Sequence, residues 1–445
     1  MKIFNTIPRI GLLCVSLEGE RIDYAKRFEK EAREGFKKLN IEIVNVSGVK
    51  LNRQSVVDAS KEIEAENADA IIYLIGTWIF ADSVVSAVQQ VDLPIAVWGV
   101  PEPVSFSSVG ANVIHGAFVE MGIAHKLFYG RPEENQTLQE IAVYCKAAMV
   151  KKRLKKARFG LIGGRAISAY TTAADPNQIK GLFGVEIDHI DQMIVLEKAR
   201  AITDASATEY FSPRKTRYRS FDVSDDVLLK SIKTAMAVEQ IIDEYELDMA
   251  SIKCLGDFIN IYTSCCMSVV FAGDAGFTMS CQCDVNATLS MYIIRLLSGG
   301  PAFYGDISTV MYADGEVRMI NCGALPTALA PNAKDISWVT QYEYMGNGRG
   351  VCPVFCMKGG NVTFGYLGRV KGEYQMLIAQ GTAFEKPIDE IVSVRTWPQG
   401  FARLHGDPRK FYYNLLSNHC VMGYGSLGME LRELCEFYDI KTVII

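Results

Sequence analysis

The sequence is poor in the features that mark several common functional classes. Its longest apolar stretch, residues 68–80, contains Asp69 and Gly76 and falls short of the roughly 18 residues that a membrane-spanning helix needs. Basic residues are not in excess, since 46 Lys and Arg stand against 51 Asp and Glu. A nucleic-acid-binding protein carries clustered positive charge, so we expect neither nucleic acid nor a membrane as a partner.

Cysteine and histidine patterns exclude further classes. The 12 cysteines include no Cys-x-x-Cys pair, which structural zinc sites usually contain. They are too dilute for a disulfide scaffold, so we expect buried free thiols and a cytoplasmic location. Residues 1–15 also lack the apolar core and cleavage site of a signal peptide. Only five histidines remain as candidate metal ligands or general bases: His115, His125, His189, His405 and His419.

What the sequence does contain is a long alternation of strand-like and helix-like segments. Hydrophobic residues make up 49% of the 445, enough for a sizeable core. In the first 155 residues, short apolar runs alternate with segments whose apolar residues recur every three or four positions, which is typical of a parallel sheet covered by helices. The predicted strands are 9–16, 41–46, 70–75 and 94–98, and the predicted helices are 24–39, 56–66 and 82–90.

A basic run, Lys151–Lys156, marks the first predicted domain boundary. It is either a phosphate-binding patch or, as the acidic composition favours, a solvated helix end. A second α/β domain is predicted over 156–302, with strands at 159–162 and 249–255 and helices at 225–245 and 285–297.

The sequence pattern changes in residues 303–445. Short apolar runs are separated by turn signals, such as Ala313-Asp314-Gly315, Gly346-Asn347-Gly348 and Lys371-Gly372, which is typical of antiparallel strands. A helix at 427–438 and a strand at 441–445 close the chain. The predicted architecture is therefore α/β: two doubly wound parallel-sheet α/β domains, 1–155 and 156–302, followed by a C-terminal antiparallel β-barrel-like domain, 303–445.

Three residues stand out as chemical candidates. Asp284 lies just before the predicted helix at 285, where a carboxylate either caps the helix or serves a site. Asp306 follows an apolar strand, a position where carboxylates often face a cleft. His419 lies among polar residues between apolar segments, in Ser417-Asn418-His419-Cys420.

Three separated segments resemble the L-fucose isomerase family and, more loosely, L-arabinose isomerase. The first is Gln282–Met291, similar to the family's Glu-x-Asp-x-x-Gly-Ala-Leu-Thr-Met segment. The second is Phe303–Ile307, similar to the family's strand with a metal-binding Asp. The third is Asn418-His419 with the glycines that follow it. The segments occur in the family's order and at roughly its spacing.

The resemblance implies an aldose–ketose isomerase that works through an enediol and uses a divalent cation, most often Mn²⁺. It implies that Gln282, Asp306 and His419 are the metal ligands, and that Asp306 and Gln282 occupy the catalytic positions. We count Asp284, Asn286, Asn418 and Trp98 as candidate substrate-binding residues. The family's members are homo-oligomers, trimers or hexamers, so we expect a homo-oligomer with a small-molecule sugar substrate.

The most serious departure from the family pattern is at position 282. Gln282 stands where the family has Glu, and an uncharged amide cannot act as a general base. Three hypotheses follow: a metal-dependent sugar isomerase; the same fold and metal site used for another enediolate reaction of epimerase, lyase or aldolase type; or a catalytically impaired sugar-binding protein.

Overall fold

The computed structural model describes residues 6–44, 46, 48–341 and 348–445. The chain forms two compact units, one that ends at Lys152 and one that begins at Arg153. The basic run 151–156 lies at the end of the helix that crosses this boundary, so the helix-end interpretation of that run is confirmed. The predicted second and third domains lie within the same compact unit.

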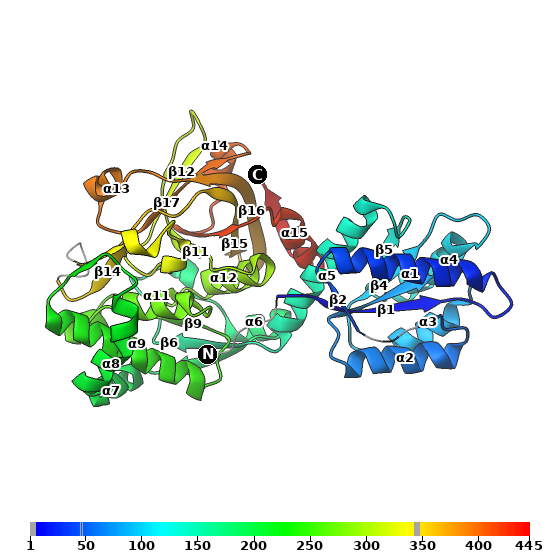
Figure 1. Cartoon of the computed structure of the whole chain (residues 1–445), viewed down its shortest axis with the longest axis horizontal. Coiled ribbons are helices and arrows are strands. Elements are labelled where there is room, and N and C mark those ends of the chain that lie inside the picture. The colour runs from blue at the N-terminus through cyan, green and yellow to red at the C-terminus, as the bar shows by residue number, and fades with distance from the viewer. Residues whose placement is uncertain (1–5, 45, 47, 342–347) are drawn as a thin grey trace. The chain divides into compact units, whose positions relative to one another are not determined.

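The first unit is built on a parallel sheet with strand order β2-β1-β3-β4-β5 (Figure 1). Its central strands are buried on both faces, because helices cover the sheet from two sides. The predicted strand 41–46 is shorter than expected, and its Asn45 lies outside the described residues. The elements are β1 (Arg9–Val15), α1 (Ile22–Lys38), β2 (Glu42–Ile43), α2 (Arg53–Ala65), β3 (Ala70–Ile75), α3 (Ala81–Val88), β4 (Ile95–Gly99), α4 (Ser107–Met121), β5 (Lys126–Tyr129) and α5 (Asn135–Lys155).

The second unit begins with another parallel sheet, of order β10-β9-β6-β7. The predicted strands at 159 and 249 and the predicted helices at 225 and 285 are all present. The elements are β6 (Arg158–Ile162), α6 (Pro176–Phe183), β7 (Glu186–Ile190), α7 (Gln192–Ala201), α8 (Asp204–Lys215), β8 (Ser220–Asp222), α9 (Asp225–Glu244), β9 (Met249–Ile252), α10 (Asp257–Ile261), α11 (Cys266–Asp274), β10 (Thr278–Cys281) and α12 (Val285–Ser298).

Most of the remaining strands of this unit form a mostly antiparallel sheet of order β15-β18-β11-β12-β17-β16-β19, in which β15 also pairs with β16. Strands β13 and β14 form a separate small sheet with β8, of order β14-β13-β8. This confirms the antiparallel C-terminal part, while its barrel-like form stays a prediction. The predicted turn at 346–348 begins in residues outside the described part. The elements are β11 (Phe303–Val310), β12 (Glu316–Ile320), β13 (Ser337–Thr340), β14 (Val351–Val354), β15 (Gly360–Val370), β16 (Glu373–Phe384), α13 (Ile388–Val394), β17 (Gln399–Leu404), α14 (Pro408–Tyr413), β18 (His419–Tyr424), α15 (Gly428–Glu436) and β19 (Lys441–Ile444).

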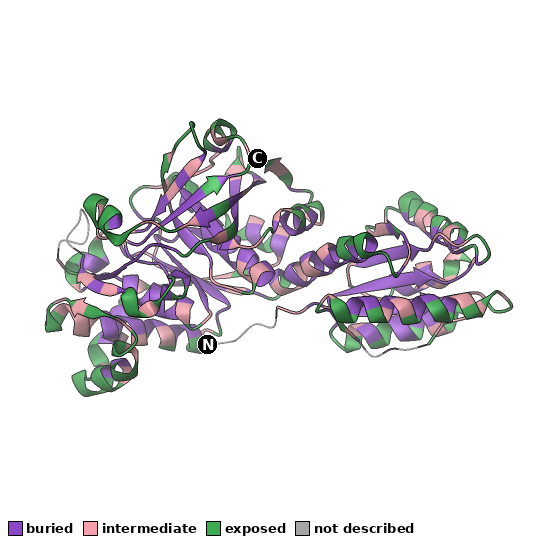
Figure 2. Cartoon of the chain, turned by 45° about the horizontal axis from the view of Figure 1, so that its top comes forward, coloured by how far each residue is buried: buried purple, intermediate pink, exposed green. Residues whose placement is uncertain are grey.

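Helix α12 connects the parallel sheet and the large antiparallel sheet of the second unit. Twelve of its 14 residues are buried, because it packs on strands β9 and β10 of the parallel sheet and on β15 and β18 of the antiparallel sheet. Figure 2 shows the buried strands and this helix inside the unit, while helices at the periphery expose one side. The N-terminus of α12 thus lies where residues from both sheets can meet.

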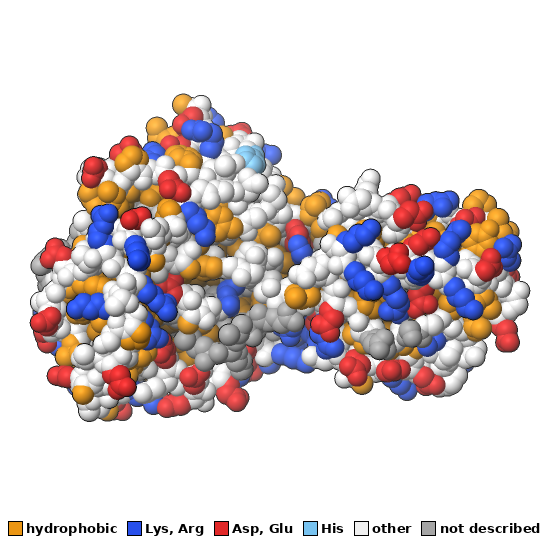
Figure 3. Space-filling view, in the orientation of Figure 1, with side chains coloured by type: hydrophobic (Ala, Val, Ile, Leu, Met, Phe, Trp, Pro, Cys, Tyr) orange, Lys and Arg blue, Asp and Glu red, His pale blue; other side chains and the backbone are white. Residues whose placement is uncertain are grey.

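Two further findings concern partners and surface. Among the described residues, no helix is long and apolar enough to cross a membrane. Figure 3 shows acidic and basic side chains interspersed over one face of the molecule, in line with the near balance of charges in the sequence.

Candidate functional site

Strand pairing brings Asp306 and His419 together. Strands β11 and β18 are antiparallel neighbours, and their register places these two residues directly opposite each other. The Nε2 atom of His419 lies 3.7 Å from Oδ1 of Asp306. Asp306 was expected to follow a strand, but it lies inside β11, with 41% of its side chain exposed, whereas the His419 side chain is 1% exposed. A buried imidazole edge therefore faces a solvent-accessible carboxylate.

The N-terminus of α12 holds the imidazole from the other side. Asp284 caps the helix by accepting a 2.9 Å hydrogen bond from the backbone N–H of Ala287 at Oδ1, so the predicted cap is confirmed. Its Oδ2 lies 2.7 Å from Nδ1 of His419, and both side chains are fully buried. In the tautomer whose Nδ1–H donates a hydrogen bond to this carboxylate, the lone pair that can bind a metal is on Nε2. This is the arrangement that metal-binding histidines usually have.

Gln282 lies in the turn between β10 and α12. Gln282 and Cys283 both have left-handed backbone conformations, with φ of 64° and 51°, which non-glycine residues rarely adopt. The Gln282 side chain is buried, and its Oε1 has no hydrogen-bond partner among the described residues. An unsatisfied buried acceptor costs about 1–3 kcal/mol. This amide oxygen is therefore available to a ligand.

Tyr304 is a site residue that the sequence reasoning missed. Its hydroxyl lies 3.1 Å from Nδ1 and 3.2 Å from Nε2 of His419, and 3.4 Å from the carbonyl oxygen of Cys281. Burial is the main cause that raises the pKa of this phenol well above its ordinary value, helped by nearby Cys281, Asp284 and Asp306. The hydroxyl therefore stays protonated. Alternation along a strand puts residues 304 and 306 on one face, which is the signal that could have identified it.

The two predicted asparagines are also in this region. Asn418 donates a 2.5 Å hydrogen bond to Oδ1 of Asp306. Asn286, on α12, donates to the carbonyl oxygen of Thr171 at 3.0 Å and accepts from the Tyr374 hydroxyl at 3.4 Å. Asn286 thus has protein partners for both polar atoms, whereas Asn418 orients one of the candidate ligands.

Trp98 lies in the other compact unit. It is part of β4, its side chain is fully buried, and its Nε1 donates to the carbonyl oxygen of Gly130 at 2.9 Å. Its predicted role in substrate binding stays a prediction.

The donor set partly matches the requirements of a divalent cation. Among the described residues, no group of three or more His, Cys, Asp and Glu side chains is placed to hold a metal ion. With Gln282, however, three different donors are present around the N-terminus of α12: an imidazole nitrogen, an accessible carboxylate and an amide oxygen without a hydrogen-bond partner among the described residues. Such mixed N and O donors suit Mn²⁺ and related cations. The residues therefore fit a cation, with one negative charge fewer than a carboxylate in position 282 would supply.

Comparison with known proteins identifies the class of the C-terminal part. Residues 319–445 match the family model described as the L-fucose isomerase, C-terminal domain, so this part of the chain is similar to that domain. The matched range includes His419, and the resemblance predicted from the sequence motifs is confirmed.

Curated relatives extend the likeness over nearly the whole chain. A sulfoquinovose isomerase of Priestia megaterium is 21% identical over 439 residues, which cover 94% of this chain and 97% of the relative. A sulfoquinovose isomerase of Alkalicoccus urumqiensis is 21% identical over 398 residues, 87% of this chain and 89% of that protein. These relatives support the isomerase class of enzyme that the sequence predicts. Among solved structures, a glucose-galactose binding protein of Geobacillus stearothermophilus aligns with 66% of this chain and 92% of its own at 14% identity, with a TM-score of only 0.18.

Proposed function

We propose that this protein is an aldose–ketose isomerase that binds a divalent cation, most often Mn²⁺, and acts on an anionic sugar such as sulfoquinovose. The observation that carries the proposal is the buried Asp284–His419 pair, whose second imidazole nitrogen, Nε2, faces Asp306. The printed name of the curated relatives supports the choice of sugar.

The cation would be held by His419, Asp306 and the amide oxygen of Gln282. When bound, it would polarise the sugar carbonyl and stabilise negative charge on the adjacent oxygens. The chain supplies the other parts of the reaction. Asp284 fixes the orientation of His419, and Asn418 fixes one oxygen of Asp306.

The proton transfer is assigned to Asp306. Isomerisation through an enediol removes a proton from the carbon beside the carbonyl and returns a proton to the former carbonyl carbon, and no atom is gained or lost. Asp306 is the carboxylate of the site that solvent and substrate can reach, because Asp284 is fully buried. An accessible carboxylate close to the C–H bond can take and return this proton.

The direct test is conversion of sulfoquinovose to its ketose in D₂O with added Mn²⁺, followed by NMR. We expect conversion with deuterium incorporated at the carbon that receives the proton. The variants His419→Ala and Asp306→Asn should lose about 10²–10⁴-fold in rate. His405→Ala is the matched control, because that imidazole is exposed and bonds to Thr382 in the same sheet. Equal losses in all three variants would contradict the assignment.

Metal analysis provides a readout that does not depend on activity. After dialysis against Mn²⁺ and gel filtration, we expect roughly one ion per chain in the unaltered protein and in His405→Ala, and far less in His419→Ala. Retention of no cation by the unaltered protein would overturn the metal-dependent proposal.

A second function is favoured by one specific observation, the neutral amide at position 282. With Asp306 as the one accessible carboxylate of the site, a different enediolate reaction, such as epimerisation or C–C cleavage, would need only a single proton-transfer group. Deuterium exchange into the sugar without ketose formation would favour this second function.

A further inference from the structure

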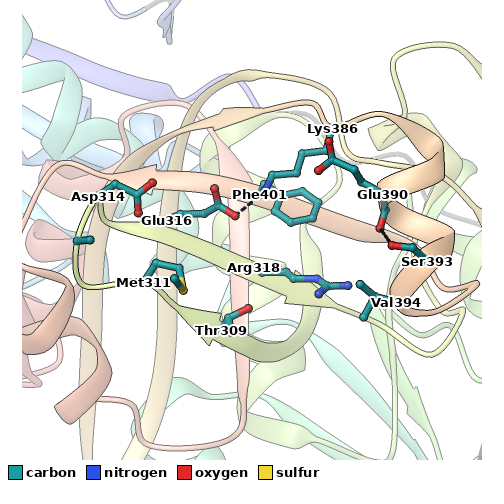
Figure 4. A pocket seen from close by; sticks show the side chains of 11 residues that line it. Thr309, Met311, Asp314, Glu316, Arg318, Lys386, Glu390, Ser393, Val394 and Phe401 are labelled. Carbon is teal, nitrogen blue, oxygen red and sulfur yellow. Dashed lines mark hydrogen bonds and ion pairs between the residues drawn. The ribbon is translucent and has the colours of Figure 1, made fainter.

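A separate pocket of about 560 Å³ opens beside strands β11, β12 and β17 and helix α13 (Figure 4). The proposed isomerase site does not use its residues. The pocket combines apolar side chains with two cations and three carboxylates. Its lining residues are Thr309, Met311, Ala313, Asp314, Glu316, Arg318, Lys386, Glu390, Ser393, Val394 and Phe401.

The sheet register relates this pocket to Asp306. Thr309 pairs with Arg318, and Arg318 pairs with Phe401, so these three side chains form one row across β11, β12 and β17. The neighbouring row on the same face contains Asp306 and Ile320, because directly paired residues share a face. Because β11 has a register shift between Ile307 and Thr309, the three residues from Asp306 to Thr309 match two residues of β12, a distance of roughly 7 Å along the sheet. The pocket therefore begins one row from the proposed proton-transfer group.

A buried glutamine fixes Arg318 in this pocket. The Nε and Nη2 atoms of Arg318 donate to Oε1 of Gln399, at 2.9 and 2.6 Å. Gln399 is fully buried, and its Nε2 donates to the carbonyl oxygens of Ile391 and Arg395. The amide cannot rotate without losing these bonds, so the guanidinium is preorganised. Three of its five N–H groups remain for a ligand.

Arg318 is also the cation of this pocket that has no ion-pair partner among the described residues. Lys386 pairs with Glu316 at 2.7 Å, and Asp314 pairs with Arg403 at 3.6 Å. Among the described residues, Arg318 has no carboxylate partner, and its acceptor Gln399 is neutral. Partial burial lowers the pKa of the guanidinium, and the nearby carboxylate of Glu316, which pairs with Lys386, opposes this effect only in part. The remaining carboxylate, that of Glu390, is on an exposed residue of α13.

We propose that this pocket receives the anionic end of the sugar substrate, a sulfonate or carboxylate, which Arg318 binds through its free N–H groups. The planar, fixed fork of an arginine suits oxygens of such groups better than a flexible lysine does. Phe401 lies under both cations, with Arg318 Cζ at 5.7 Å and Lys386 Nζ at 4.5 Å from its ring centre, and provides an apolar floor for the carbon chain. This inference rests on the proposed isomerase function and makes Arg318 the residue that selects an anionic sugar over a neutral one.

The first test measures binding without catalysis. Propane-1-sulfonate, which carries the charged group and no sugar, is titrated into the full-length protein by calorimetry. We expect binding that weakens with added NaCl, at least tenfold weaker in Arg318→Gln and intermediate in Arg318→Lys. Arg432→Gln is the control, because this half-exposed arginine on α15 pairs with Glu436 and lines no part of the pocket. No binding to the unaltered protein, or equal binding by Arg318→Gln, would overturn the proposal.

The second test connects the pocket to the sugar. Propane-1-sulfonate should inhibit sulfoquinovose isomerisation competitively. In Arg318→Gln the KM for sulfoquinovose should rise at least tenfold, while any turnover of neutral L-fucose should not change. Inhibition that is not competitive would mean that the pocket serves a separate anion, which overturns the assignment to the substrate.

The two proposals can fail separately. Absence of any isomerisation together with Arg318-dependent sulfonate binding would overturn the proposed function and leave an anion-binding pocket. Active isomerase with unchanged KM in Arg318→Gln would overturn only the substrate-selecting role. If Arg318→Gln does not fold, as judged by thermal unfolding, Arg318→Lys and the inhibition of the unaltered protein decide the question.

Discussion

Single side chains in the site have more than one contact, and Asp284 is the clearest case. One of its oxygens caps α12 and the other binds the imidazole of His419. The two contacts contribute different properties, because a cap stabilises the helix and a carboxylate–imidazole bond sets the tautomer of a metal ligand. They can be separated experimentally because Asn also caps helices but carries no charge.

We expect Asp284→Asn to keep most of the stability and lose activity. Asn is as good a cap as Asp, so the free energy of unfolding should change by less than about 1 kcal/mol. Loss of the carboxylate that bonds to a metal-binding histidine, by contrast, typically lowers metal affinity or activity about 10–100-fold. Asp284→Ala should lose the cap as well, about 0.5–2 kcal/mol more. Chemical denaturation and Mn²⁺ titration measure the two effects. A stable, fully active Asp284→Ala would contradict both roles.

The Oε1 atom of Gln282, which has no hydrogen-bond partner among the described residues, leads to a second prediction about a single residue. In Gln282→Glu a carboxylate replaces a buried amide whose oxygen has no hydrogen-bond partner in the described part of the chain, so the metal-free variant should be less stable than the unaltered protein, because an uncompensated buried charge is costly. Added Mn²⁺ should raise its Tm by more than that of the unaltered protein, and isomerase activity should rise if the amide limits the rate. Gln90→Glu, at an exposed position, is the control. A Tm that does not respond to Mn²⁺ would place residue 282 outside the metal site.

At the scale of elements, the site depends on how closely α12 approaches β18. Gly423 in β18 lies against Ile294 of α12, and a Cβ at this glycine would be 2.2 Å from Ile294 Cγ2. The helix carries Asp284 at its start and the strand begins with His419. The contact between glycine and isoleucine therefore allows the spacing in which the carboxylate reaches the imidazole.

We expect Gly423→Ala to destabilise the protein by about 1–3 kcal/mol, the usual cost of an overpacked core. It should also reduce activity, because α12 must move away from the strand that begins with His419. Gly181→Ala is the matched control, since nothing lies within 4 Å of a Cβ at this exposed helical position. There the substitution should be neutral or stabilising by up to about 1 kcal/mol. Measured unfolding free energies that are equal for the two variants would exclude the proposed close packing.

At the scale of the whole molecule, the chain is held together by its hydrophobic cores without covalent cross-links. All 12 cysteines are free, and 11 of them are buried, which confirms the expected buried free thiols. Burial raises the pKa of Cys420 and of Cys435 to about 12, so these thiols are protonated and unreactive near neutral pH. Cys266 differs, because hydrogen bonds with Cys254 and Cys322 hold its pKa well below the ordinary value, although it is buried.

A thiol titration tests this organisation. With a thiol-specific reagent, the native protein should react slowly, because 11 thiols are buried and hydrogen bonds with Cys266 and Cys281 raise the pKa of half-buried Cys322, whereas all 12 should react after denaturation. Reducing agent should leave the Tm unchanged, because no disulfide contributes to stability. A fall in Tm on reduction would show that the folded protein contains a cross-link.

Many elements in both units could be predicted from local sequence signals. The apolar run 70–75, the amphipathic helix 225–245 and the turn signal at 313–315 each carry their own pattern, and the structure has an element or a turn at each place. The local sequence did not give the correct end of the strand at Asp306, since this residue was expected to follow the strand. It lies within β11, because the strand continues in register with β12 past the apolar residues.

The sequence by itself determined the succession of helices and strands, the cap at Asp284 and the family resemblance, since each depends on residues close together in the chain or on motifs in order. Only the tertiary structure decided that His419 lies between Asp284 and Asp306, that Tyr304 contacts this imidazole, and that Arg318 has a neutral buried partner. These contacts join residues more than 80 positions apart, and their geometry is set by strand register and helix packing, which no local pattern encodes.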